Sequence, residues 1–139
     1  MGASPPHAGA SLIHLDTSVL VDALTGTRRS ARNLRRVIEQ GERTTISALV
    51  LYEWLRGPRV EAELTDQEEL LPHEQAVHFG SREASLAAEL YRTVPRARQR
   101  ELDLAVAACA LTHEAALWTL NPGDFRDIPG LTLYRPGAR

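Results

Sequence analysis

The chain has 139 residues, of which 43% are hydrophobic and 24% are charged, a balance typical of one globular domain with its own core. The formal net charge is -2, and no apolar run approaches the roughly 20 residues of a membrane helix, which excludes a transmembrane protein and a membrane partner. A single cysteine, Cys109, excludes an intramolecular disulfide and fits a reducing cytoplasm.

Segments with strand character alternate with segments of helical spacing along the chain. The small, Pro- and Gly-rich residues 1–11 predict a flexible tail, followed by one domain over 12–135 and a short tail over 136–139. We expect strands at 12–16, 43–47, 76–79, 115–120 and 131–134. Helices are expected at 18–24, 30–39, 48–55, 61–70, 81–94 and 98–113. This order predicts an α/β domain, with a parallel sheet covered by helices on both faces.

Charge is segregated along the sequence. Arginines gather in 28–43 and 92–100, whereas 61–74 holds six acids and no arginine. The segments are either solvated helix faces, the usual meaning of a charge run, or two basic patches beside the path of a polyanion. Both interpretations stay open on these residues alone.

Four carboxylates lie beside or inside apolar segments: Asp16, Glu53, Asp103 and Asp124. A buried, ionised carboxylate needs a partner, and no buried lysine can supply one because all 16 basic residues are arginine. A divalent cation is the economical partner, and oxygen ligands suit Mg²⁺ or Mn²⁺. In a parallel sheet the functional crevice lies beyond the C-terminal ends of the strands, where Asp16 and Asp124 both fall.

Each carboxylate also has an ordinary structural interpretation. Asp16 suits the cap of the helix that follows it, and Glu53 suits the solvent face of its helix. Asn121 and Asp124 belong to the turn composition N-P-G-D. Asp103 favours function most clearly, because the apolar run around it leaves no polar face for it to join.

Four blocks in order resemble the motif blocks of PIN-domain ribonucleases, and most closely those of VapC-type toxins from bacterial toxin-antitoxin modules. They are LDTSVLVDALTG at 15–26, TISALVLYEWLRG at 45–57, ELDLAVAACAL at 101–111 and LWTLNPGDFRDIPGLTLY at 117–134. The resemblance implies a PIN-like α/β fold with a parallel sheet of four or five strands between helices. It also implies cleavage of RNA with Mg²⁺ or Mn²⁺, and a small antitoxin as partner.

Residue roles follow from the matching positions. The resemblance implies that Asp16, Glu53, Asp103 and Asp124 form a catalytic, metal-binding acidic pocket. Thr17 or Ser18 would make a further polar contact, and Asn121 competes with Asp124 as the fourth ligand, since some relatives carry an aspartate at the position of Asn121.

Two further sets of contacts are expected. Arg98 and Arg100, just before Asp103, would hold the RNA backbone. Apolar surface on the helices at 48–57 and 18–24, including Trp54 and Leu55, would form a groove for the antitoxin. The assembly expected is a homodimer or a toxin-antitoxin hetero-oligomer.

Two other functions compete with RNA cleavage. The same acidic pocket suits a structure-specific DNA nuclease, and a PIN domain with weak catalysis would act by binding nucleic acid or a partner. Retention of all the expected carboxylates argues against the second alternative.

Overall fold

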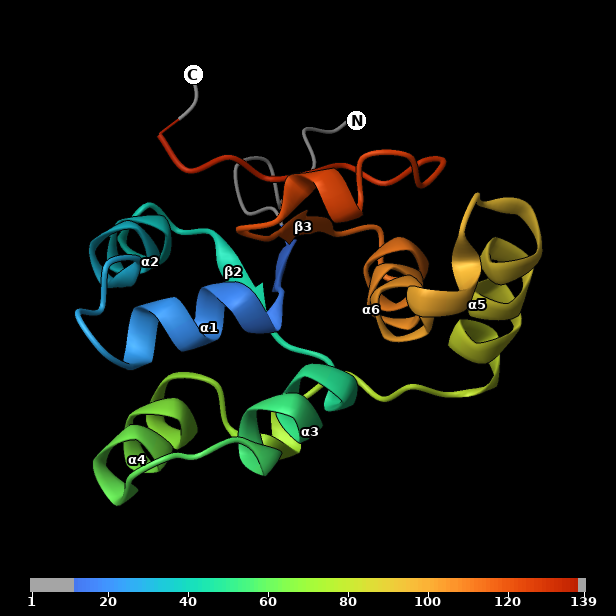
Figure 1. The fold of residues 1–139 in the computed structure, drawn as a ribbon. Coiled ribbons are helices and arrows are strands. Elements are labelled where there is room, and N and C mark those ends of the chain that lie inside the picture. The colour runs from blue at the N-terminus through green and yellow to red at the C-terminus, as the bar shows by residue number, and fades with distance from the viewer. Residues whose placement is uncertain (1–11, 138–139) are drawn as a thin grey trace, which may run out of the picture.

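Three parallel strands form the centre of the fold (Figure 1). The computed structural model describes residues 12–137, so the tail predicted over 1–11 lies outside the described residues, as do residues 138 and 139. The strands are β1 (Leu12–Leu15), β2 (Arg43–Thr45) and β3 (Ala116–Trp118), in the spatial order β2-β1-β3. The central strand pairs with both neighbours in parallel, and its Leu15 lies opposite Trp118.

The described sheet is narrower than the four or five strands expected. The predicted strands at 76–79 and 131–134 each form one isolated parallel bridge, Ser47 with Val77 and Leu117 with Leu133. Neither segment can continue its pairing: 76–79 runs into a helix that begins at Ser81, and 131–134 soon reaches Pro136, which has no backbone N–H to donate. Both segments therefore lie at the expected edges of the sheet without extending it as strands.

Six α-helices surround these strands within the described residues. They are α1 (Thr17–Leu24), α2 (Ala31–Glu39), α3 (Ala48–Arg56), α4 (Glu61–Leu70), α5 (Ser81–Thr93) and α6 (Glu101–Thr112). Figure 1 shows α1 and α2 on one side of the strands, α5 and α6 on the other, and α3 and α4 below. Over residues 12–137, no helix is both long enough and apolar enough to cross a membrane.

The helix predicted at 98–113 begins three residues later, at Glu101. Pro95 and the left-handed backbone of Arg96, with φ of 54°, turn the chain, and Ala97–Gln99 forms a separate 3₁₀ helix. Arg98 thus lies in this short turn, outside α6, which corrects the predicted helix start.

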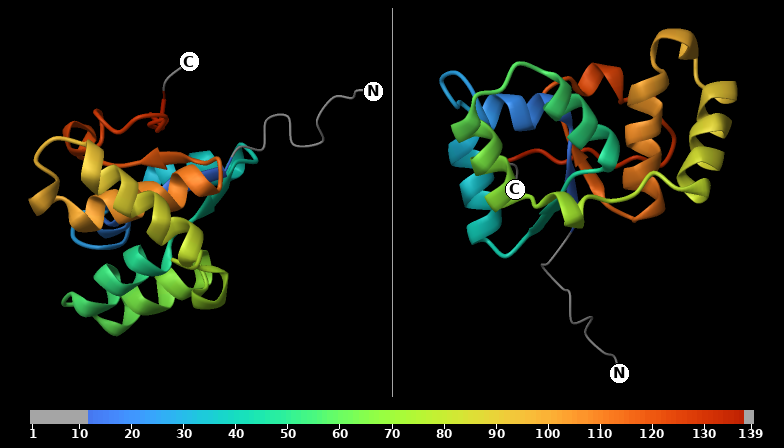
Figure 2. Two further views of the ribbon diagram at one scale, coloured as in Figure 1. Left: turned by 90° about the vertical axis from the view of Figure 1, so that its right-hand side faces the viewer. Right: turned by 90° about the horizontal axis from the view of Figure 1, so that it is seen from below.

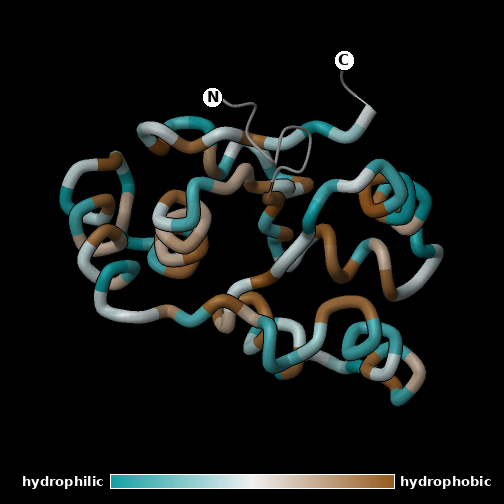
Figure 3. Tube along the Cα trace, turned by 180° about the vertical axis from the view of Figure 1, so that it is seen from behind, coloured by the Kyte–Doolittle hydropathy of each residue, from teal (hydrophilic) through white to brown (hydrophobic). Residues whose placement is uncertain are grey.

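The core is built around α6, which is apolar on almost every side. Leu104, Val106, Ala107 and Cys109 are all buried. Figure 3 shows this helix as a mostly brown, hydrophobic coil beside the mixed colours of α5. An α-helix that is hydrophobic all round is an interior element, so the polar residues at its start stand out as exceptions.

Candidate active site

Asp16 directly follows β1 and lies at the N-cap of α1, with extended backbone angles. Its side chain does not cap that helix. Instead, Oδ2 accepts hydrogen bonds from Ser18 Oγ at 2.9 Å and from Thr119 Oγ1 at 2.7 Å. The capping interpretation is therefore wrong for the side chain, and the carboxylate is held in place by two hydroxyl groups.

Thr119 is a member of the site that sequence reasoning missed. It is buried, it binds Asp16, and its Oγ1 accepts the backbone N–H of Asn121 at 3.0 Å. The signal was the strand register: Leu15 pairs with Trp118, so the next residues on the two strands, Asp16 and Thr119, emerge side by side. A polar residue at that register position was the one to look for.

Glu53 reaches the same region from α3. Ser47 caps this helix by accepting the Val50 N–H at 3.1 Å, which fixes the start of α3. Thr17 Oγ1 donates a hydrogen bond to Glu53 Oε1 at 2.5 Å, while Arg56 lies 3.8 Å from Oε2. Thr17 and Ser18 therefore each contact a different carboxylate of the set.

Asp103, in the first turn of α6, is the carboxyl group most affected by its surroundings. Desolvation, followed by the charges of Asp16, Asp124 and Glu53, raises the pKa of Asp103 to about 6, against a smaller lowering effect of Arg100. Because the charges of Asp16, Asp124 and Glu53 all act on Asp103, the four predicted carboxylates lie in one region of the fold. We call Asp16, Glu53, Asp103 and Asp124 the acidic site.

The elements that carry the acidic site meet around the C-terminal end of β1, as the view from below in Figure 2 shows. Asp124 comes from the turn after β3, where Pro122–Asp124 forms a short 3₁₀ helix, in agreement with the turn composition. This is the edge at which parallel sheets place their functional groups.

Arg100 supports that turn. Its guanidinium pairs with both carboxylate oxygens of Asp127, at 2.6 and 3.0 Å, and donates to the Asp124 carbonyl at 3.0 Å. It also donates to the Pro95 carbonyl at 2.8 Å, and its side chain is only 14% exposed. These contacts commit the guanidinium to the protein, so Arg100 positions the Asp124 turn and is poorly available for the RNA contact predicted for it.

The chemistry of the acidic site fits a hard divalent cation. All of its donors are carboxylate oxygens, and both described hydrogen bonds to Asp16 fall on Oδ2, which leaves Oδ1 for an ion. No three acidic, histidine or cysteine side chains within residues 12–137 are close enough to form a finished metal cluster. The four carboxylates therefore lie in one region without forming a finished set of ligands, and they would have to move closer together to share an ion.

The expected antitoxin surface is wrong in one residue. Trp54 is fully buried, with the guanidinium of Arg59 stacked over its ring at 4.2 Å, because Val50 and Trp54 form the inward stripe of α3. Leu55, by contrast, is 44% exposed. Trp54 thus contributes to the core and offers nothing to a partner.

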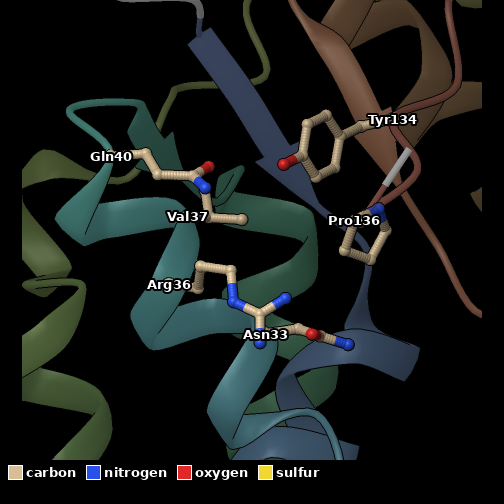
Figure 4. A pocket seen from close by; sticks show the side chains of 7 residues that line it. Asn33, Arg36, Val37, Gln40, Tyr134 and Pro136 are labelled. Atoms are coloured by element: carbon tan, nitrogen blue, oxygen red, sulfur yellow. The ribbon is translucent and has the colours of Figure 1, made fainter. Parts of the chain in front are cut away.

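A small polar hollow of about 160 Å³ lies apart from these residues, between α2 and the C-terminal segment. Figure 4 shows Arg36, Gln40 and Tyr134 around it. None of the four carboxylates of the acidic site lines it.

Comparison with known proteins shows the family of the chain. Residues 13–131 match the PIN domain family. Ribonuclease VapC19 of Mycobacterium tuberculosis is 33% identical over 124 residues, which cover 84% of this chain and 94% of the relative. The chain belongs to the PIN domain family, and within it to the relatives of this ribonuclease.

Solved structures share the fold at lower identity. DNA-bound VapBC from Salmonella typhimurium matches with a TM-score of 0.72 and 20% identity, covering 89% of this chain and 97% of that one. A toxin-antitoxin complex from Klebsiella pneumoniae matches with a TM-score of 0.60 and 22% identity, covering 94% and 100%.

Proposed function

We propose that this protein is a metal-dependent endoribonuclease and the toxin of a toxin-antitoxin pair. The observation that carries the proposal is that four carboxylates from the end of β1, α3, α6 and the turn after β3 lie in one region, where Thr17 binds Glu53 and both Ser18 and Thr119 bind Asp16. The raised pKa of Asp103 supports it. Four carboxylates without a bound cation would repel a phosphodiester, so this arrangement favours a site that binds a divalent ion. The kinship with ribonuclease VapC19 supports RNA as the substrate.

The residues divide the work between holding and orienting. Asp16, Asp103, Glu53 and Asp124 would hold Mg²⁺ or Mn²⁺, with Asn121 beside Asp124 as an alternative oxygen donor. A bound divalent ion acidifies a water molecule and neutralises the charge that develops on the phosphate. Fixed hydroxyls hold two of the carboxylates in one orientation before substrate arrives, which lowers the reorganisation required during reaction. These are Thr17 on Glu53 and the pair Ser18 and Thr119 on Asp16.

Arg98 is the better candidate of the two arginines for the RNA backbone. It lines an open hollow of about 590 Å³ with Arg96, Gln99 and Glu101, the first residue of α6. Part of the other basic segment has a structural partner, because Arg28 pairs with Asp66 of the acidic segment at 3.2 Å. Arg98→Ala should therefore weaken RNA binding and reduce its salt dependence by about one phosphate contact, whereas the Arg28 pair belongs to charge balance.

A direct test compares matched RNA and DNA strands with the purified protein. Cleavage of RNA in Mg²⁺ or Mn²⁺, its loss with a chelator, and its loss in Asp16→Asn are expected. Preferred cleavage of DNA would favour the structure-specific DNA nuclease. If neither RNA nor DNA is cleaved in the presence of metal, a PIN domain that only binds its partner would be favoured.

The antitoxin partner is best accommodated by an apolar groove of about 400 Å³ between α1, α2 and α4. Its apolar lining residues are Ala23, Leu24, Ala31, Leu34, Ile38 and Leu70. This retains the predicted contribution of α1 but replaces that of α3. A groove lined in this way suits the apolar face of an amphipathic helix.

Two exposed apolar residues separate the two possible partner surfaces. Ile38 borders the groove and is 37% exposed, whereas Leu55 lies in a different hollow beside α4. We expect Ile38→Asp to weaken capture of the cognate antitoxin at least about tenfold, as expected when a charge replaces a buried apolar contact, and Leu55→Glu to leave it nearly unchanged. The opposite result would return the partner to the α3 surface.

A further inference from the structure

A further hollow, of about 410 Å³, adjoins the acidic site between α1, the turn after it and the segment after β3. Its wall includes Thr17 and Ser18, the residues whose hydroxyls bind Glu53 and Asp16. Whatever occupies the hollow therefore lies beside whatever is bound at the carboxylates. We call it the α1 hollow; its other lining residues include Val21, Thr25, Arg29 and Leu120.

Leu120 is an exposed apolar residue at the edge of a polar site. It is 44% exposed. Its backbone N–H donates to Ser18 Oγ at 3.0 Å, and its neighbours are fixed as well, because Thr119 binds both Asp16 and the N–H of Asn121. The exposed position is thus enforced by the same hydrogen bonds that hold Asp16, and a flat apolar group would find a fixed contact there.

The polar groups of the α1 hollow are chemically specific. Thr25 Oγ1 donates its proton to the Val21 carbonyl at 2.7 Å, so it offers a ligand only acceptor lone pairs. Arg29 is 79% exposed and pairs with Asp22 at 3.2 Å. Asp22 also accepts a 2.6 Å hydrogen bond from Ser30, so Arg29 can turn towards an anion without leaving that carboxylate unpaired.

An apolar wall, hydroxyl acceptors and a movable cation are together the groups that a nucleotide needs. We propose that the α1 hollow binds the nucleoside next to the phosphate that is cleaved, a proposal that rests on the ribonuclease function above. Leu120 and Val21 pack against the base or ribose, Thr25 accepts from a ribose 2′-hydroxyl or a base amino group, and Arg29 binds the following phosphate. An RNA strand fits better than a protein segment, because the shared wall of Thr17 and Ser18 makes the occupant continuous with the group at the carboxylates.

The test replaces Leu120 and keeps its backbone hydrogen bond. Leu120→Ala is compared with Leu120→Met, which retains the apolar contact, and with Val60→Ala, a matched truncation of a 62% exposed residue at the start of α4. In an Asp103→Asn background, which leaves RNA intact, fluorescence anisotropy measures the Kd for a short RNA. Leu120→Ala should raise Kd about fivefold, the effect expected from the loss of a partly buried aliphatic contact, and the other two variants should stay within about twofold.

A second readout uses the active protein and a pool of RNA sequences. In Leu120→Ala the KM should rise in parallel with Kd, kcat should change little, and the base preference beside the cleaved bond should broaden. If Leu120→Ala matches Val60→Ala in Kd, KM and cleavage sites while the unchanged protein cleaves RNA, the α1 hollow is not a nucleoside site and the ribonuclease function stands. If the unchanged protein neither binds nor cleaves RNA, the proposed function itself fails and the assignment of the hollow fails with it.

Discussion

Two carboxylates near opposite ends of α6 differ in how the protein treats their charge. Asp103 lies at the start of the helix, and Glu83, at the start of α5, contacts its end. Glu83 is the more buried of the two, with only 9% of its side chain exposed. Yet the pKa of Glu83 is lowered, whereas the pKa of Asp103 is raised to about 6.

Hydrogen bonds explain the difference. The Glu83 carboxylate is stabilised against desolvation by three donors. They are its own backbone N–H, the Gly80 N–H at 3.0 Å from Oε1 and the Thr112 hydroxyl at 3.0 Å from Oε2. For Asp103, desolvation, followed by the charges of three other carboxylates, raises the pKa. Burial alone therefore does not distinguish the two acids: hydrogen bonds compensate the charge of Glu83, whereas the surroundings of Asp103 oppose its charge, as the proposed cation site requires.

The largest expected effect comes from Asp103→Asn, which removes the carboxylate whose pKa is raised. Metal-dependent RNA cleavage should fall at least about a hundredfold, since even changes to groups that merely support metal ligands cost roughly 10–100-fold. Folding should be retained, because the substitution removes a charge that repels its neighbours. Circular dichroism and a cleavage assay measure both properties, with Glu89→Gln on the exposed face of α5 as the control. Cleavage at the unchanged rate would remove Asp103 from the active site.

Glu83→Ala tests the compensated end. Loss of the hydrogen bonds to Gly80 and Thr112 should lower the free energy of unfolding by about 2 kcal/mol, the usual cost of removing a buried, charge-assisted partner. Cleavage per folded molecule should stay nearly constant, because Glu83 does not belong to the acidic site. Urea denaturation and active-site titration separate these two quantities. A large loss of specific activity in a fully folded variant would contradict a purely structural role of Glu83.

The same comparison explains how far the sequence could predict the molecule. Asp103 was recognisable because an acid within the apolar run of α6 has no polar face to join, and this is a local property. The buried pairing of Glu83 could not be predicted from local sequence, because its partners Thr112 and His113 lie at the end of a different helix. Local pattern predicted the element order well, apart from the edge segments at 76–79 and 131–134, whose single bridges depend on tertiary geometry.

The burial of Trp54 and the contacts of Arg100 share one physical reason. Trp54 was expected on the surface, but α3 packs with Val50 and Trp54 towards the core. Arg100 looked free in the sequence, yet Asp127 and the Asp124 carbonyl engage it across a chain reversal. Side-chain direction and long-range pairing are set by packing between elements, which periodicity does not encode.

Thr119→Val tests the hydrogen bonding of Asp16. This carboxylate belongs to the acidic site, as Asp103 does, but accepts hydrogen bonds from hydroxyl groups, as Glu83 does. The substitution keeps the shape of the side chain but removes the 2.7 Å hydrogen bond to Asp16 and the acceptor of the Asn121 N–H. We expect kcat/KM to fall about tenfold, in the range found for groups that orient metal ligands, with a stability loss of about 1 kcal/mol. Thr93→Val, which removes an exposed hydroxyl bonded to the Glu89 carbonyl, is the matched control. Equal kinetics in the two variants would leave Asp16 oriented by Ser18 alone.

The smallest expected effect is on the pH dependence of stability without metal. It measures directly how far the charge of Asp103 is left without a stabilising partner. The pKa of Asp103 in the folded protein, about 6, lies above its ordinary value of 3.8, so between about pH 4 and 6 the folded state binds more protons than the unfolded state. Stability should therefore fall as pH rises through this window and then level off, with Asp103 ionised in both states. Two pKa units correspond to about 3 kcal/mol at most, and solvent screening of this partly exposed group reduces the expected loss to about 1 kcal/mol. Asp103→Asn should remove that slope, and urea denaturation of both proteins in a chelator at intervals between pH 4 and 7 measures it. Parallel curves for the two proteins would mean that neither desolvation nor the neighbouring carboxylates raise the pKa of Asp103, and this support for a cation among them would be lost.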